Sequence, residues 1–204
     1  MKMWMLAAIL ILCGASMTSC GNKAAKQTEN KAQIEASAQP EAEAVEVKEE
    51  PTCFTAIDDY LVNEIGKNYA QSDVCIPYVY VVSMDETNSD DIRVWGDFWV
   101  FNYELSGDTL KTASGGSHPG LMHVKKTENG FEVTNFDAVA DGADNLPTAK
   151  KIFGDKFDAF SELNSDQERR EEKRMQITAD YVKKHNLSAK VLQDFGWPAV
   201  ELPQ

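Results

Sequence analysis

The most conspicuous candidate for chemistry is Asp97, a carboxylate between Gly96 and Phe98 in the most apolar stretch of the chain, residues 92–105. In an apolar cleft the pKa of this carboxyl group would rise, as a general base requires. The alternative is that Gly96 and Asp97 mark a β-bulge whose carboxylate bonds the backbone or faces water. We favour the bulge, because paired structural carboxylates are common and catalytic ones are rare.

Three large aromatic residues could line a ligand pocket beside Asp97, namely Trp95, Trp99 and Tyr103. A strand places alternate residues on one face, so all four side chains would lie on the same side of a sheet. Pockets for small molecules are lined mainly by apolar and aromatic side chains. Large aromatic residues more often form ordinary core, however, and we favour that interpretation for these three.

Two histidines are the remaining candidates. His118 lies in a Gly-rich segment and could overhang the mouth of a pocket, and His123 could pair with a carboxylate such as Asp97. A surface or hydrogen-bonded role is the simpler interpretation for each. The acidic segments 85–91 and 137–144 lack the ligand spacing of a calcium loop, and no short motif supports a two-histidine metal site. We therefore expect no metal and no other cofactor.

The balance of charges excludes one large class of partners. The chain has 33 acidic and 20 basic residues, which gives a formal net charge of -13. Nucleic acid and anionic membrane surfaces should repel it, and no basic cluster opposes this effect. The chain also lacks a Gly-rich phosphate loop, a dinucleotide fingerprint and the Ser-His-Asp order of a hydrolase. The sequence therefore does not reveal an activity.

The stretch that carries these candidates is predicted to be a central strand. One face holds the aromatic residues and Asp97, and the other holds Ile92, Val94, Phe98 and Val100. Both faces are apolar, which is typical of a strand that is covered on both sides.

Further strands are predicted from period-two patterns at residues 76–84, 109–114, 121–127 and 131–137. The Gly- and Pro-containing segment 115–120 is predicted to be a loop, and Asn129-Gly130 signals a hairpin. With a two-residue or four-residue turn, that hairpin would place Met122 and Val124 on one face and His123 near Phe136 on the other.

Helices are expected before and after the sheet. Thr52 is a candidate N-cap, and apolar residues then recur at helical spacing for about four turns. More helix is predicted after Pro147, and a capping box at residues 165–168 begins a helix that should reach His185. The first half of this last helix is almost entirely charged and should project into solvent. The apolar residues of the tail, 191–197, should dock on the domain.

Residues 1–19 have the composition of a secretory signal peptide. Lys2 precedes a short apolar run, residues 4–12, and small or polar residues follow. The segment ends in Met-Thr-Ser-Cys-Gly, residues 17–21, which resembles a bacterial lipobox with Met in place of Leu. The resemblance implies cleavage before Cys20 and a lipid on its sulfur, which would anchor the chain to a membrane. Ordinary secretion with Cys20 as a free thiol is the alternative.

Residues 20–52 are expected to be the lipidated cysteine and a disordered linker, because residues 21–52 contain no aromatic and few aliphatic side chains. A single domain, residues 53–204, should follow. Its two cysteines, Cys53 and Cys75, would face an oxidising compartment and could form a disulfide. They flank a predicted helix, which tends to hold them apart, so the sequence leaves the bridge open.

Taken together, the elements predict an α+β fold with a long N-terminal helix packed on a curved, mainly antiparallel sheet of about five strands, followed by C-terminal helices. This order resembles the cystatin-like and nuclear-transport-factor-like class. The lipobox and the segments at 96–103 and 115–120 resemble small lipoproteins of gut Bacteroidota, a family without an established activity. Some members of the wider class hold a small apolar ligand or catalyse isomerisation or dehydration, but no catalytic motif of theirs can be matched here.

Two functional hypotheses follow. The first is a non-enzymatic lipoprotein of the cell envelope whose domain binds a small apolar ligand or another envelope protein. The lack of acidic residues directly after Cys20 favours the outer membrane, with the domain facing the periplasm. The alternative is a small-pocket lyase, isomerase or hydrolase that uses Asp97 with His118 or His123. That enzyme needs a histidine within hydrogen-bond reach of Asp97, directly or through one water.

Overall fold

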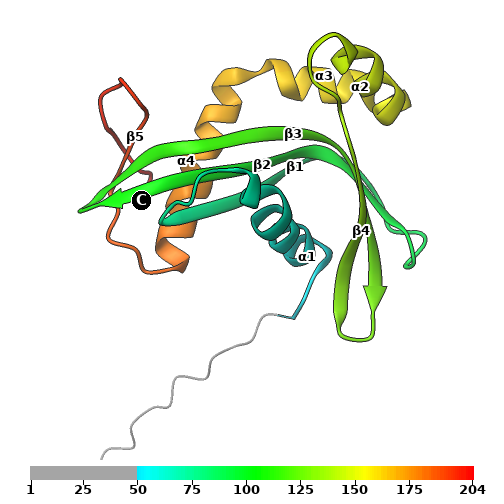
Figure 1. The fold of residues 1–204 in the computed structure, drawn as a ribbon, viewed down its shortest axis with the longest axis horizontal. Helices are drawn as coiled ribbons and strands as arrows, with labels where there is room; N and C mark the ends of the chain where they lie inside the picture. The colour runs from blue at the N-terminus through cyan, green and yellow to red at the C-terminus, as the bar shows by residue number, and fades with distance from the viewer. Residues whose placement is uncertain (1–49) are drawn as a thin grey trace, which may run out of the picture. The chain divides into compact units, whose positions relative to one another are not determined.

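The computed structural model describes residues 50–204, so the predicted signal peptide, Cys20 and most of the predicted linker lie outside the described residues. All described residues belong to one compact unit, Val47–Gln204. Its fold is α+β, with a curled mixed sheet that carries helices on both faces (Figure 1). Within residues 50–204 no helix is both long enough and apolar enough to cross a membrane.

Four longer strands and two short ones form the sheet: β1 (Val74–Asp85), β2 (Ile92–Ser106), β3 (Thr109–Thr127), β4 (Gly130–Ala138), β5 (Val191–Gln193) and β6 (Val200–Glu201). The strand order is β1-β2-β3-β5-β6, and β4 pairs with the C-terminal half of β3. β5 runs parallel to β3, whereas the other pairings are antiparallel. β2 is therefore an interior strand, as its two apolar faces predict.

The segment predicted as a loop, residues 115–120, is instead the middle of the continuous strand β3. Its glycines make this possible. A Cβ atom at Gly115 would lie 2.4 Å from the Val100 carbonyl oxygen, and one at Gly120 would lie 2.4 Å from the Asp137 carbonyl oxygen. Glycines in sequence usually indicate a turn, but here they permit close approach of neighbouring strands where the sheet curls.

The hairpin between β3 and β4 turns at residues 128–129 and pairs Val124 with Val133, so these two residues share a face as predicted. A register shift between His123 and Val124 then pairs Met122 with Phe136. Phe136 consequently packs on the same core as Met122, and the prediction that it lies near His123 is wrong. A bulge of one residue reverses the facing of every residue beyond it, and nothing in the sequence pattern locates this bulge.

One face of the sheet is covered by helix α1 (Cys53–Tyr60). Thr52 is its N-cap, as predicted, and its hydroxyl accepts a hydrogen bond from the Thr55 backbone N–H. The regular α-helix has only eight residues; it continues as a π-helical turn, η1 (Leu61–Ile65), and a 3-10 turn, η2 (Gly66–Asn68). The segment expected to be one four-turn α-helix therefore changes its hydrogen-bonding pattern after Tyr60.

A hydrophobic cluster lies beneath α1. Its buried residues come from α1, η1 and the first three strands: Cys53, Ile57, Leu61, Val79, Ile92, Val94, Phe98, Val100, Met122 and Val124. The sheet curls around this core, so that Phe136 of β4 meets Tyr60 edge-to-face, with ring centroids 6.5 Å apart. The face predicted for alternate residues of β2 is confirmed.

The two cysteines of the domain both contact this core, but the disulfide that the sequence left open is not formed. Cys53 and Cys75 are free thiols. Burial, with a smaller contribution from the charge of Glu86, raises the pKa of the Cys53 thiol to about 11. Cys53 is therefore a thiol at neutral pH and behaves as a small apolar core residue.

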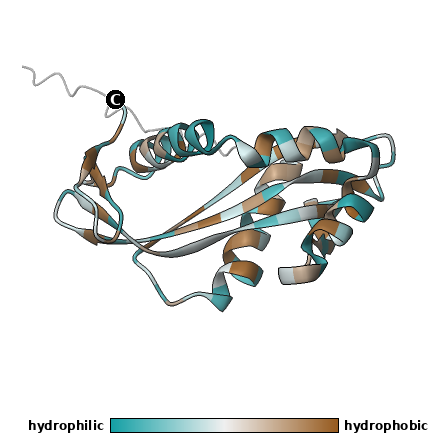
Figure 2. Cartoon of the chain, turned by 90° about the horizontal axis from the view of Figure 1, so that it is seen from above, coloured by the Kyte–Doolittle hydropathy of each residue, from teal (hydrophilic) through white to brown (hydrophobic). Residues whose placement is uncertain are grey.

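The opposite face is covered by α2 (Asn145–Phe153), α3 (Phe157–Ser165) and α4 (Gln167–Lys184), with short 3-10 turns at η3 (Gly142–Asp144) and η4 (Gly154–Lys156). Each of the three α-helices carries both hydrophobic and hydrophilic residues, as expected of helices that cover a sheet (Figure 2). Trp95 packs against α2 and α3, where the Phe153 and Phe160 rings stack with centroids 4.1 Å apart.

Helix α4 differs from its prediction in two ways. Its N-cap is Asp166, whose carboxylate accepts from the Arg169 backbone N–H at 3.0 Å, so the cap lies one residue after the predicted Ser165. Its charged first half does not simply project into solvent, because the side chains of Arg170 and Arg174 are only 18% and 12% exposed. Both arginines turn toward carboxylates, which stabilise buried guanidinium groups.

The tail docks only in part. Leu192 is buried in β5, in contact with the cluster that lies under α4. Phe195 and Trp197, which were expected to dock, are instead 96% and 72% exposed.

Candidate functional site

Asp97 is fully buried on the α4 side of the sheet, and its carboxylate accepts three side-chain hydrogen bonds. The donors are the Ser117 hydroxyl at 2.6 Å, the Trp99 indole N–H at 2.7 Å and the Arg170 guanidinium at 3.4 Å. The prediction of a backbone-bonded or solvent-facing carboxylate is therefore wrong. The bulge lies in β1, between Val81 and Ser83, across from Gly96.

The pKa of Asp97 is raised above its ordinary value. Burial raises it, and the hydrogen bonds from Ser117 and Trp99 together with the positive charge of Arg170 oppose the rise. Gly96 permits close approach of β1 to β2 beside this carboxylate, because any Cβ at that position would lie 2.7 Å from the Tyr80 carbonyl oxygen. The result is a rigid, fully partnered group beneath the surface of the sheet.

Neither histidine is hydrogen-bonded to Asp97. His118 pairs with Phe98 on the α1 side of the sheet, and its Nε2 lies 2.9 Å from the Tyr69 hydroxyl. His118 influences Asp97 only through space, and burial lowers the pKa of His118.

His123 lies elsewhere on the sheet, between Asp91 and Asp137. Its Nδ1 is 2.6 Å from an Asp91 carboxylate oxygen, and its Nε2 is 3.4 Å from one of Asp137. Four carboxylates of the acidic segments thus form ion pairs, namely Asp85 with Arg93, Asp90 with Lys125, and Asp91 and Asp137 with His123. Among residues 50–204, no group of three or more His, Cys, Asp or Glu side chains could hold a metal ion.

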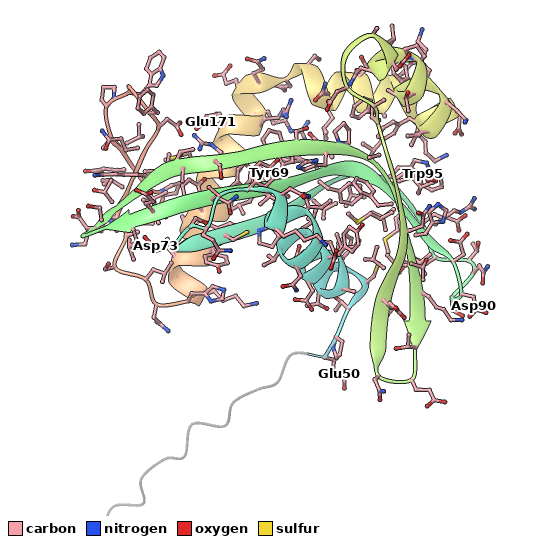
Figure 3. All side chains as sticks on the ribbon, in the orientation of Figure 1. Glu50, Tyr69, Asp73, Asp90, Trp95 and Glu171 are labelled. Atoms are coloured by element: carbon pink, nitrogen blue, oxygen red, sulfur yellow. The ribbon has the colours of Figure 1, made fainter. Side chains whose placement is uncertain are left out.

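Of the three aromatic candidates, two are core. Trp95 is buried, donates its indole N–H to the Ile152 carbonyl oxygen at 3.0 Å and lies under the Lys156 ammonium. Tyr103 is fully buried, with its hydroxyl 3.4 Å from that of Thr178. Only Trp99 lines a groove. Trp95 lies away from this groove. Glu171, which lines the groove, and Trp95 lie toward opposite ends of the sheet (Figure 3).

We call the hollow between β2, β3 and α4 the Trp99 groove, and its volume is about 520 Å³. Its main lining residues are Tyr80, Trp99, Phe101, Thr112, Ser114, Arg170, Glu171, Arg174 and Asp194. The Trp99 and Phe101 rings stack with centroids 5.1 Å apart, and the Arg170 guanidinium lies over the Trp99 ring at 4.6 Å. The groove therefore has an aromatic floor and polar walls.

The outer wall is a second ionic network. The Arg174 guanidinium donates to Asp194 at 2.6 Å and to Glu171 at 2.7 Å, and the Thr112 hydroxyl donates to Asp194 at 2.6 Å. Burial of Asp194 opposes its ionisation, but the hydrogen bonds from Arg174 and Thr112 prevail and hold its pKa below the ordinary value. This network ties α4 to β3 and to the C-terminal tail.

Sequence reasoning missed Arg170, Arg174 and Asp194. The spacing of the two arginines was an available signal, because residues i and i+4 lie on one face of a helix. Their partners were not available, since Asp97 and Asp194 are 73 and 20 residues away from them in sequence. Long-range ion pairs leave no local pattern.

Two other hollows, of about 520 and 540 Å³, also border α4. The first is lined mainly by charged side chains of α4 and by tyrosines of β1, and the second is lined by both polar and apolar side chains of α4 and of the tail. The Trp99 groove alone among these three has stacked aromatic rings in its floor, and its residues Trp99 and Arg170 bond the fully buried carboxylate of Asp97.

Comparison with known proteins finds no family model, no curated protein and no solved structure that matches this chain.

Proposed function

We propose that this protein is a membrane-anchored lipoprotein of the bacterial cell envelope whose domain binds a small uncharged ligand in the Trp99 groove. The observation that carries the proposal is the groove itself. Its volume of about 520 Å³ lies within the range of small-molecule sites, and apolar rings surrounded by a few fixed polar groups are typical of such sites.

The charges around the groove favour an uncharged ligand. Arg170 already pairs with Asp97, and Arg174 already pairs with Glu171 and Asp194. A charged ligand would have to break one of these pairs and leave a half-buried charge without its partner, which is costly. A ligand with a flat apolar face and hydroxyl or amide groups at its edge would stack on the floor and bond the walls without that cost.

Three probes of similar size that share a phenyl ring and differ in charge test this choice: benzyl alcohol, benzoate and benzylammonium. The neutral probe should raise the melting temperature of the protein, by about 3 °C at ten times its Kd. The two charged probes should raise it less. Equal stabilisation by benzoate would show that a guanidinium is available, and it would contradict the proposal.

Trp99→Ala should abolish the shift caused by benzyl alcohol. Trp95→Ala is the matched control, because Trp95 lies on the same face of the same strand, outside the groove. Both variants should melt at a lower temperature than the parent, since both lose a large ring and an indole hydrogen bond. Only Trp99→Ala should also lose the response to the probe.

The envelope location rests on the resemblance of residues 17–21 to a lipobox. The matching experiment is mass spectrometry of the mature N-terminus from bacterial membranes. The expected N-terminal residue is Cys20 bearing a diacylglycerol on its sulfur. An unmodified Cys20, or a mature chain that begins elsewhere, would overturn the anchor and leave the groove proposal intact.

A further inference from the structure

The tail contains an unusual exposed segment, residues 195–200, with the sequence Phe-Gly-Trp-Pro-Ala-Val. All six residues are exposed, and none carries a charge. The exposed fractions of Phe195, Trp197 and Val200 are 96%, 72% and 56%. Single exposed apolar residues are normal, but a contiguous exposed apolar segment usually marks a binding surface. We call it the aromatic turn.

The aromatic turn is held in place by its neighbours. The Trp197 backbone N–H donates to the Asp194 carbonyl oxygen at 3.1 Å, and the Gln193 side-chain amide donates to the Trp197 carbonyl oxygen at 3.2 Å. Gly196 has a φ of +78°, which closes this turn and which residues other than glycine rarely adopt.

The turn is also fixed at its base, because the Asp194 carboxylate is bound by Arg174. Figure 1 shows the segment between β5 and β6 in red, projecting from the end of the sheet. The turn therefore presents its two aromatic side chains outward at little further cost in conformational entropy.

We propose that the aromatic turn inserts into the interface of a lipid bilayer. The small apolar area of the aromatic turn favours a bilayer over a protein partner. Two aromatic side chains bury about 150–250 Å² each, whereas a stable protein interface buries at least about 1,200 Å² in total. The interfacial region of a bilayer accepts Trp and Phe without a complementary pocket, because Trp rings are amphipathic and the region is itself part apolar.

Insertion of two side chains binds a membrane only weakly, and the proposed lipid on Cys20 would supply the additional membrane affinity. A tethered chain meets the membrane at a high effective concentration, so a weak second contact becomes occupied. The turn would then orient the domain. Because Asp194 begins the turn and also lines the Trp99 groove, insertion would bring the mouth of the groove close to the membrane surface.

Charge sets the expected lipid preference. The chain has a net charge of -13, so anionic lipids should repel it, and the insertion should be strongest with zwitterionic lipids. Apolar insertion also depends little on salt, whereas attraction between charges is screened. Preference for zwitterionic lipids and weak dependence on salt therefore distinguish apolar insertion from adsorption through a charged patch.

The test uses the chain from residue 20 onward with Cys20→Ser, so that no lipid contributes, and sediments it with phosphatidylcholine vesicles. The parent should bind at millimolar lipid. Replacing both aromatics, Phe195→Ser with Trp197→Ser, should lower its partition coefficient about 10-fold. Leu146→Ser is the matched control, because Leu146 is 54% exposed on α2, and its loss should change nothing. The melting temperatures of all variants should match the parent, since these side chains are exposed.

Depth is measured separately with brominated phosphatidylcholine, which quenches tryptophans that enter the bilayer. Quenching should disappear in Trp197→Phe while binding persists, because Trp95 is buried and Trp99 faces the groove. Three results would overturn the proposal: no binding of the parent to vesicles, equal binding of the doubly substituted variant, or self-association of the parent that the double substitution abolishes. The last result would assign the turn to a second copy of the chain. None of them bears on benzyl alcohol binding at Trp99, so the two proposals can fail independently.

Discussion

The two faces of the sheet are built from alternate residues of the same strand, β2, yet they differ in kind. On the α1 face the buried cluster beneath α1 is hydrophobic and includes Val94, Phe98 and Val100. On the α4 face the neighbouring positions hold Asp97 and Trp99, with ion pairs and a groove above them. The helix that covers each face accounts for this difference in polarity. α1 contributes buried Ile57, whereas the first half of α4 contributes arginines that pair with carboxylates, and only its second half buries Ala179 and Val182 in a hydrophobic cluster.

This contrast separates stability from function. The α1 face is closed, and it accounts for much of the apolar burial that holds the domain together. The α4 face is only partly filled near Trp99, and its polar groups are fixed by one another rather than by dense apolar packing. Substitutions on the two faces should therefore have different consequences for stability and for ligand binding.

The largest effect on stability is expected on the closed face. Phe98→Ala removes a fully buried ring and should lower the free energy of unfolding by about 4 kcal/mol. Urea denaturation of the parent and the variant measures this value. Binding of benzyl alcohol by the molecules that remain folded should be unchanged, because Phe98 faces away from the groove. A lost probe response in folded Phe98→Ala would break the comparison between the two faces.

A smaller effect on stability, with a loss of binding, is expected from Asp97→Asn. The amide keeps the shape of the side chain but leaves Arg170 without its anionic partner, at a cost of about 2 kcal/mol. Arg170 also lies over the Trp99 ring, so its release should disturb the groove floor and weaken probe binding. Ser117→Ala is the milder companion, since it removes a single donor. Unchanged probe binding in Asp97→Asn would show that the buried network does not support the groove.

The pH dependence of stability should identify one weak point on the α1 side. Burial and the nearby charge of Asp59, partly offset by Lys184, raise the pKa of Asp58 in α1 to about 6. The folded protein thus holds this proton more tightly than the unfolded chain does. The ionised carboxylate destabilises the fold above pH 6 and has no effect below about pH 4.

Asp58→Asn should accordingly raise the free energy of unfolding by about 1 kcal/mol at pH 8 and by nothing at pH 4. This change in the free energy of unfolding is smaller than the shift in the pKa of Asp58 alone would give, because Asp58 is partly exposed and water screens its charge. Urea titrations at the two pH values measure the difference. An equal effect at both would refute the role of the Asp58 proton.

The smallest effect is expected at the outer wall of the groove. Arg174→Lys keeps the charge but loses the planar fork that serves Glu171 and Asp194 together, at a cost of about 1 kcal/mol. Because the tail is held less tightly in this variant, the amide hydrogen of Leu192 in β5 should exchange with solvent faster than it does in the parent protein. Amide exchange in β1, on the far side of the sheet from β5, serves as the internal control.

Local patterns in the sequence predicted much of this fold. Period-two alternation assigned Val94 and Asp97 to opposite faces of β2, and Asn129-Gly130 marked the β3–β4 hairpin. Where glycines serve close approach rather than turning, as at Gly115, the same rules failed. The site was harder to predict than the fold. Asp97 stood out as a carboxylate in an apolar strand, but its partner Arg170 lies in a run of charged residues in which no local pattern distinguishes one arginine from another.

The central claim is that the α4 face binds a small uncharged ligand over Trp99. NMR of the indole N–H groups, during titration with benzyl alcohol at about 10 mM, tests it most directly. In the chain from residue 20 onward, Trp95, Trp99 and Trp197 each give one signal in a different environment. The Trp99 signal should shift, and those of Trp95 and Trp197 should not. A shift confined to Trp95 or Trp197, or no shift at all, would contradict it.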